Sequence, residues 1–170
     1  MMRLWGTVLL LAGTTSVGIC ALRSMNGRVK DLNGLICALE GMKRALSSRE
    51  ESLGVMLRSA SASAPGRVGV LFQALYIGLE NLDGEPFCCL WEKTLKSAQL
   101  RCGSEDLQIC SRLGKVLGSC DAESQSAALE EAIRALSAAL EEAREQRDNR
   151  GRVYVTLSAS CGLLLVILLI

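Results

Sequence analysis

Two segments without a single charged residue lie near the ends of this 170-residue chain, and they constrain its fold more than any other feature. The first covers Leu4–Leu22, which is 19 residues, and the second covers Val153–Ile170, which is 18 residues. A helix of this length rises about 27 Å, close to the ~30 Å hydrocarbon core of a bilayer. We therefore expect transmembrane helices over 4–22 and 153–170, with a separate domain over 23–152 between them.

The charges beside these segments predict on which side of the membrane the middle domain lies. Basic residues follow the first segment and precede the second: Arg23, Arg28, Lys30, Arg144, Arg147, Arg150 and Arg152. Lys and Arg beside membrane helices remain mainly on the cytoplasmic side, so we expect a cytosolic domain in a cell-membrane protein. The alternative is that the first segment is a cleaved signal peptide, with Ser16-Val17-Gly18 before the cleavage site.

The composition of the middle domain favours helices and balances its charges. Residues 23–152 hold 18 of the 19 Lys and Arg residues and all 18 Asp and Glu residues, so no basic surface for nucleic acid is expected. Histidine is absent, which removes His-based acid–base catalysis and His-ligated metal sites. Two prolines and 4% aromatic residues are few for a β sandwich or barrel.

Apolar residues recur every three or four positions along the domain, which predicts an all-α bundle of about six helices flanked by the two transmembrane helices. The expected helices cover roughly residues 25–46, 50–60, 68–82, 86–95, 104–117 and 121–149, and Ser59–Gly66 is expected to be a loop. Gly34 and Gly41 lie on nearly one face of the first helix and indicate close approach by another helix. A heptad pattern marks the last helix through Leu129, Ile133, Leu136, Leu140 and Ala143.

No motif of an enzyme active site accompanies this pattern. The chain lacks a G-x-x-x-x-G-K-[ST] or G-x-G-x-x-G phosphate loop and the S-x-x-K and G-x-S-x-G serine motifs. We expect no catalytic activity, cofactor or metal, and we interpret Trp91 as a core residue. The domain cysteines are expected to be buried apolar residues, with a redox pair at Cys88-Cys89 as the alternative: Cys37, Cys88, Cys89, Cys102, Cys110 and Cys120.

Small residues in the apolar segments are candidates for packing between membrane helices. Gly6 and Gly13 are seven residues apart, and Ser158 and Gly162 are four apart, so each pair lies on nearly one helix face. Gly114 and Gly118 have the same four-residue spacing in the domain, where tight packing of two helices is the simpler interpretation.

The last third of the chain resembles the stage III sporulation protein AB family of endospore-forming Gram-positive bacteria. The stretch from Leu113 to Gln125 is similar to the family's L-G-x-x-L-G-x-x-D-x-x-x-Q pattern, and Cys161–Ile170 is similar to its G-L-L-x-V-I-L-L-I terminus. Glu40 stands where the family commonly has the first acid of an L-E-x-E-I segment, although Met42 replaces the second acid. The family's proline-containing loop is also missing, with Ser47–Gly54 in its place.

The resemblance implies a cytosolic six-helix domain similar to the cytoplasmic domains of type II secretion inner-membrane platform proteins. It implies a place on the mother-cell side of the channel between mother cell and forespore. The implied partners are the secretion-type ATPase of the same operon and small membrane proteins of the complex, with a homo-oligomer as a further possibility. The matching residues are candidates for partner contacts: Glu40, Gly114, Gly118, Asp121 and Gln125.

Two other functions remain as alternatives to a platform that docks an ATPase to the membrane complex. The bundle could be a membrane-anchored adaptor or regulator that binds an unrelated soluble protein, or a thiol enzyme that uses Cys88-Cys89. A gene for a secretion ATPase next to this one would favour the platform, and full function of the complex after both cysteines are changed to serine would end the thiol hypothesis.

Overall fold

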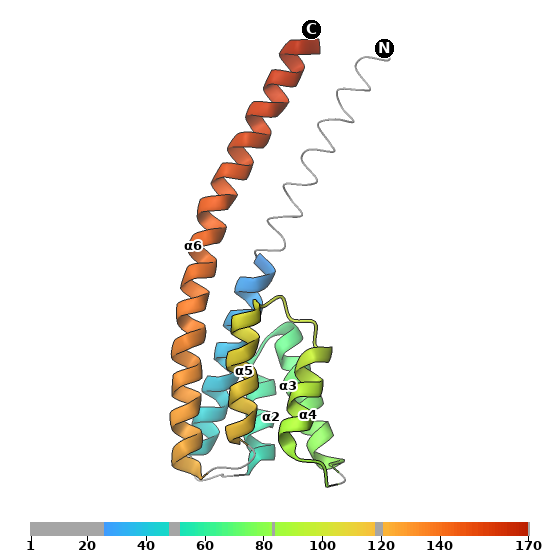
Figure 1. Ribbon diagram of the computed structural model, residues 1–170, viewed down its shortest axis with the longest axis vertical. Coiled ribbons are helices and arrows are strands. Elements are labelled where there is room, and N and C mark those ends of the chain that lie inside the picture. Colours follow the sequence, from blue (N-terminus) through green and yellow to red (C-terminus); the bar gives the residue numbers. More distant parts are fainter. Residues whose placement is uncertain (1–25, 48–51, 83, 118–120, 170) are drawn as a thin grey trace. The chain divides into compact units, whose positions relative to one another are not determined.

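The computed structural model describes residues 26–47, 52–82, 84–117 and 121–169, the last part without the side chains of 150–159 and 161–169. Within these ranges the regular structure consists of helices, with no strand (Figure 1). The first helix, which has no label in Figure 1, covers residues 26–47. It is followed by α2 (Leu53–Ser63), α3 (Gly66–Glu80), α4 (Phe87–Ser97), α5 (Ser104–Leu117) and α6 (Ala122–Leu169). The prediction of an all-α fold with about six helices is confirmed for this part of the chain.

The chain divides into two compact units, and the helical bundle is the unit over residues 28–141. It contains most of the first helix, all of α2 to α5, and the beginning of α6. Helices that follow one another in sequence pack together, since α2 contacts α3, α3 contacts α4 and α4 contacts α5. Among the described residues, the other unit contains residues 26–27 and 142–169.

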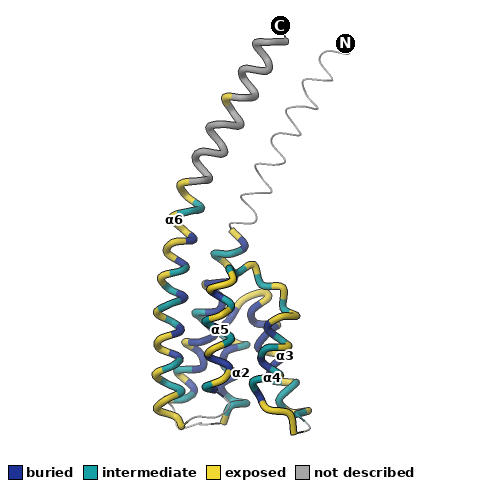
Figure 2. Tube along the Cα trace, viewed as in Figure 1, coloured by how far each residue is buried: buried dark blue, intermediate teal, exposed yellow. Residues whose placement is uncertain are grey.

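The core of the bundle is built from the apolar stripes that the sequence periodicity predicts, and Figure 2 shows buried residues on the inward faces of its helices. Burying one such side chain contributes about 1.5–3 kcal/mol relative to leaving it exposed. Every helix of the bundle contributes side chains that are at most 3% exposed, among them Leu32, Leu39, Met42, Met56, Leu57, Leu71, Phe72, Leu75, Trp91, Leu113, Leu129 and Leu136.

Glycines allow the first helix to approach its neighbours closely, as predicted. A Cβ atom at Gly34 would lie 3.1 Å from Cγ2 of Val68 in α3, and one at Gly41 would lie 2.6 Å from Oγ of Ser63 in α2. The short distance at Gly41 also lets the hydroxyl of Ser59 donate a 3.0 Å hydrogen bond to its carbonyl oxygen.

The expectation of a loop over Ser59–Gly66 is wrong for most of that segment, because α2 continues to Ser63. The small polar residues that suggested a loop make tertiary contacts instead. The hydroxyl of Ser61 donates a 3.1 Å hydrogen bond to the carbonyl of Gly69, and Ala60 is 0% exposed. Close packing between helices requires small side chains here. A local sequence pattern does not distinguish such a segment from a flexible loop, because both are rich in small polar residues.

The helix α6 runs without interruption from Ala122 to Leu169 and shows a small shift in the expected heptad seam. Leu129, Leu136, Leu140 and Ala143 are buried, as predicted. The fifth residue expected in the seam was Ile133, but it is only half-buried, and its neighbour Ala132 is buried instead. The five buried residues of the seam are therefore spaced by 3, 4, 4 and 3 positions. The larger side chain therefore lies at the edge of the buried stripe.

The structure does not confirm the two expected transmembrane segments. Segment 4–22 lies outside the described residues, and only the backbone of 153–169 is described apart from Ser160. Among the residues that are described, no helix combines the length and the apolar character that crossing a bilayer requires.

Candidate functional site

The candidate residue Gly114 has a packing role in the middle of α5. It is buried, and a Cβ atom built there would overlap the indole ring of Trp91 in α4. The indole comes close enough to the α5 backbone for its Nε1–H to donate a 2.8 Å hydrogen bond to the carbonyl of Cys110. Gly114 thus gives Trp91 the space it needs to join α4 to α5.

Trp91 is a core residue, as predicted, and it has aromatic neighbours that the sequence does not reveal. Its ring centroid is 5.9 Å from that of Phe72 in an edge-to-face arrangement and 5.8 Å from that of Phe87. Such pairs add about 0.5–1.5 kcal/mol beyond the burial of apolar area. The three rings hold α3, α4 and α5 together on one side of the bundle.

The candidate residues Asp121 and Gln125 form the connection between α5 and α6. The carboxylate of Asp121 accepts hydrogen bonds from the Ser124 backbone N–H at 3.1 Å and from its hydroxyl at 2.8 Å, so Asp121 caps α6. These bonds to Ser124 lower the pKa of Asp121. The side-chain amide of Gln125 donates a 3.4 Å hydrogen bond to the carbonyl of Leu117, the last residue of α5.

Gly114 lies within α5, Asp121 and Gln125 lie at the beginning of α6, and Glu40 lies on the first helix. Glu40 is exposed there. Three candidates, Gly6, Gly13 and Gly118, lie outside the described residues. Ser158 and Gly162 lie in the helical backbone of α6, where their side chains are not described.

A surface groove of about 140 Å³ lies between α5 and the beginning of α6. Its lining is mainly apolar, with one charged residue from each helix: Ile109, Arg112, Leu113, Val116, Ala128, Glu131, Ala132 and Ala135. The alanines of α6 leave the groove open because their side chains end at Cβ. Arg112 and Glu131 are both exposed. The groove can accept an apolar side chain flanked by polar groups, and we define it as the α5–α6 groove.

The α5–α6 groove was not predicted, although one signal for it exists in the sequence. Ala128, Ala132 and Ala135 are spaced by four and three residues, which places three small side chains on one face of α6. Of the residues that the family resemblance selected, Gln125 connects the two helices of the groove, through its hydrogen bond to the carbonyl of Leu117.

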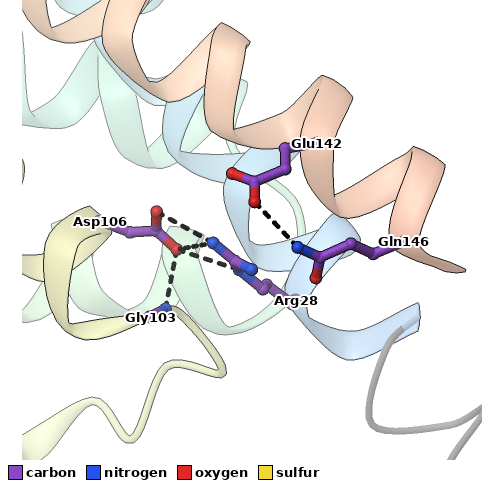
Figure 3. Close-up of polar contacts among 5 residues, drawn as sticks. All are labelled: Arg28, Gly103, Asp106, Glu142 and Gln146. Carbon is purple, nitrogen blue, oxygen red and sulfur yellow. Dashed lines mark hydrogen bonds and ion pairs between the residues drawn. The ribbon is translucent and has the colours of Figure 1, made fainter.

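A polar cluster joins the beginning of the first helix to the beginning of α5 (Figure 3). Asp106 is 2% exposed, and its carboxylate contacts Arg28 through Nε at 3.2 Å and Nη2 at 3.4 Å. It also accepts a 2.7 Å hydrogen bond from the backbone N–H of Gly103, which is one half of a capping box for α5. Asp31, 8% exposed, accepts the backbone N–H of Arg101 at 2.8 Å.

These contacts give the cluster a structural rather than a chemical role. Every buried side-chain nitrogen or oxygen in the described residues has a hydrogen-bond partner. The cluster therefore has no buried polar atom without a partner, which is the feature that would point to a missing ligand. Within the described residues no three His, Cys, Asp or Glu side chains are grouped so as to hold a metal ion.

The described cysteines are free thiols and only partly match the expectation of buried apolar residues. Cys110 is buried, Cys37, Cys88 and Cys102 are half-buried, and Cys89 is exposed. Burial raises the pKa of Cys110 to about 12 and, with a further contribution from Cys110, raises that of Cys102 to about 12.

The pair Cys88-Cys89 lies in the first turn of α4. A hydrogen bond with Cys88 raises the pKa of Cys89, and the negative charges of Glu85 and Glu92 add to the effect. A reactive cysteine needs a lowered pKa, because the thiolate is the nucleophile. The environment of Cys89 thus acts against the thiol-enzyme alternative.

Comparison with known protein families identifies the family of this chain. The sequence profile of the stage III sporulation protein AB family matches residues 3–170. The chain belongs to the stage III sporulation protein AB family. The resemblance of its last third to this family is confirmed over nearly the whole length.

A solved structure of stage III sporulation protein AB has the same fold as this family member. It superposes with a TM-score of 0.64 at 20% sequence identity, over 72% of this chain and 98% of that one. No curated protein matches the sequence. Membership of the stage III sporulation protein AB family agrees with the all-helical bundle and assigns the chain to sporulation.

Proposed function

We propose that this chain is a non-enzymatic platform component of the sporulation channel between mother cell and forespore, where it docks a secretion-type ATPase to the membrane complex. The observation that carries this proposal is the family match over residues 3–170. In the proposed arrangement the bundle lies in the mother-cell cytoplasm, and segments 4–22 and 153–170 hold it at the membrane beside the small membrane proteins of the complex.

The α5–α6 groove is the surface that best suits a docked ATPase segment. Its floor is apolar, which provides the binding free energy, and its two rims have opposite charges, Arg112 on α5 and Glu131 on α6. An apolar helix ridge with an acidic residue on one side and a basic residue on the other fits this surface. Rim charges of this kind mainly set orientation and association rate.

Copurification of the ATPase with the full chain from sporulating cells tests the proposal. The double variant Arg112→Glu, Glu131→Arg reverses both rims without changing the net charge, and Ala128→Trp fills the groove. We expect each to reduce the recovered ATPase by about tenfold, which corresponds to ~1.4 kcal/mol of binding free energy.

A matched control reverses two exposed charges on another surface. The variant Glu85→Lys, Lys93→Glu, with one residue just before α4 and one within it, also keeps the net charge, and we expect it to retain the ATPase. Normal recovery with both groove variants would contradict docking at the groove. Recovery of a different soluble protein, lost in the groove variants, would instead support the adaptor alternative.

A further inference from the structure

The two walls of the α5–α6 groove repeat one spacing. Each wall has three apolar residues, separated by four and then three positions: Ile109, Leu113 and Val116 on α5, and Ala128, Ala132 and Ala135 on α6. Seven residue steps of a helix correspond to about 10.5 Å. Each wall therefore has the length of two helical turns.

The helices α5 and α6 run in opposite directions along the groove. Figure 1 shows α5 ending at the end of the bundle where α6 begins, and the amide of Gln125 in α6 donates its hydrogen bond to the carbonyl of Leu117 across this junction. Arg112 and Glu131 each stand three positions after the first lining residue of their helix. Both charges therefore lie near the middle of the groove, on opposite sides of it.

Burial distinguishes the floor of the groove from its rims. Arg112 and Leu113 are consecutive on α5, as are Glu131 and Ala132 on α6, so the two members of each pair diverge by about 100° around their helix. Leu113 is 3% exposed and Ala132 is 5% exposed, whereas Arg112 and Glu131 are exposed. A segment in the groove thus meets apolar side chains below it, a positive charge on the α5 side and a negative charge on the α6 side.

This surface suits a helix better than an extended segment. Apart from Arg112 and Glu131 at the rims, the lining residues are apolar, so the floor offers no hydrogen-bond partner to an extended backbone. A helix satisfies its own backbone groups. Apolar residues at positions n, n+4 and n+7 of a helix share one face and have the spacing and length of the two walls.

We propose that the α5–α6 groove binds an amphipathic α-helix of at least two turns, with apolar residues at n, n+4 and n+7. This inference rests on the proposed function, in which the groove docks the ATPase, and it assigns the helix to that ATPase. The bound helix lies nearer to α6 than to α5, because alanine side chains end at Cβ and allow closer approach. Its two flanks carry opposite charges, acidic beside Arg112 and basic beside Glu131.

The rim charges also set the direction of the bound helix. In a helix that lies in the groove parallel to α6, position n+3 is on the flank facing α5 and position n+1 is on the flank facing α6, as the right-handed turn of the chain requires. An acid at n+3 and a base at n+1 then meet the opposite charges of Arg112 and Glu131. In the antiparallel direction the same two side chains would meet like charges.

Binding of a designed peptide to the purified full chain tests this inference. The probe is a fluorescent, alanine-rich peptide with Leu at n, n+4 and n+7, Glu at n+3 and Lys at n+1, and binding is measured by fluorescence anisotropy. The control peptide has the same composition but carries Leu at n, n+2 and n+5, which do not share a helix face. We expect the probe to bind with a Kd below about 100 μM and the control to bind at least tenfold more weakly.

A groove variant and a crosslink locate the bound peptide. Ala128→Trp should weaken probe binding at least tenfold, with an unchanged helix content by circular dichroism. In a Cys89→Ser background, Ala127→Cys and Ala138→Cys place thiols at exposed positions of α6 near the two ends of the groove. A probe with Cys at its N-terminus should form at least tenfold more mixed disulfide with Ala127→Cys, because the helix runs parallel to α6.

Reversal of the rims provides a second test of direction. In the Arg112→Glu, Glu131→Arg variant the same probe should bind in the opposite direction and form the disulfide preferentially with Ala138→Cys. An unchanged preference for Ala127→Cys would contradict the role of the rim charges.

The helix inference and the proposed function fail in different ways. Equal binding of probe and control peptide, or full probe binding to Ala128→Trp, would overturn the helix inference. If Ala128→Trp abolishes probe binding but recovers the ATPase normally from cells, the groove is a helix site and the ATPase is not its partner.

Discussion

At the scale of single residues, Gly114 shows how a position that resembles a contact site can be required for packing. In the sequence it is part of a family pattern and is spaced four residues from Gly118. In the structure it allows the indole of Trp91 to contact the α5 backbone and to donate its hydrogen bond to Cys110. The indole, and not an external partner, excludes a side chain at this position.

We predict that Gly114→Ala destabilises the protein. Alanine favours a helix over glycine by up to ~1 kcal/mol, but the added methyl group would displace Trp91, and overpacking of a core costs about 1–3 kcal/mol. The free energy of unfolding of the purified full chain, measured with urea and circular dichroism, should fall by roughly 1–2 kcal/mol.

Gly54→Ala in α2 is the control for this prediction. The nearest atom to a Cβ there is Oγ of Ser52 at 3.6 Å, an ordinary contact. This variant should be as stable as the wild-type protein or more stable. Equal stability of the Gly114→Ala and Gly54→Ala variants would contradict the packing role of Gly114.

At the scale of elements, the ion pair between Arg28 and Asp106 determines how the first helix meets α5. The two residues are 78 positions apart, and the carboxylate is almost completely buried while Arg28 is 29% exposed. The capping hydrogen bond from Gly103 to the same carboxylate places the beginning of α5 at this contact. Two helix ends are thus held by one side chain.

We predict that replacing either partner of this pair destabilises the bundle, and that the change at Arg28 costs more than the change at Asp106. Arg28→Met leaves a buried carboxylate without its cation and should cost about 2 kcal/mol, less than a fully buried pair because Arg28 is partly exposed. Asp106→Asn should cost less, since the amide oxygen can still accept the N–H of Gly103. The double variant should be more stable than the sum of the single changes predicts, by about 1 kcal/mol in urea unfolding.

The pair between Lys43 and Glu130 provides the control for the Arg28 variants. Its atoms are 2.7 Å apart, but the two side chains are 41% and 49% exposed. Lys43→Met should therefore leave the unfolding transition almost unchanged. A loss as large as that of Arg28→Met would show that burial does not explain the difference between the two pairs.

At the scale of the whole molecule, the proposed membrane attachment predicts where the bundle is accessible. Cys89 is an exposed native thiol. If the bundle lies in the cytosol, a membrane-impermeant maleimide should label Cys89 only after cells are permeabilised. Labelling is read from the full chain, with Cys89→Ser as the control that assigns the signal. Labelling of Cys89 in intact cells would contradict a cytosolic bundle.

Prediction from the sequence succeeded where the physical cause is local. The 3.6-residue periodicity of a helix is visible within a dozen residues, so the helices and most buried positions were predicted, from Leu32 in the first helix to Leu140 in α6. The family was identified from a motif that is contiguous along the chain.

Prediction failed where distant residues or small side chains decide the outcome. The continuation of α2 through Ser63 depends on contacts with Gly41 and Gly69, and the choice of Ala132 over Ile133 depends on the space available beside α6. The α5–α6 groove likewise arises from how two helices pack. These features are set by the packing of surfaces, which periodicity does not encode.

The sequence by itself thus determined that this chain is helical, which faces of its helices are buried, and to which family it belongs. Only the tertiary structure decided that Trp91 meets Phe72 and Phe87, that Arg28 pairs with Asp106, and that Val70 and Ile77 of α3 remain exposed. The reason is physical: helix formation and apolar periodicity act over a few neighbouring residues, whereas these contacts exist only after the complete bundle brings separate helices together.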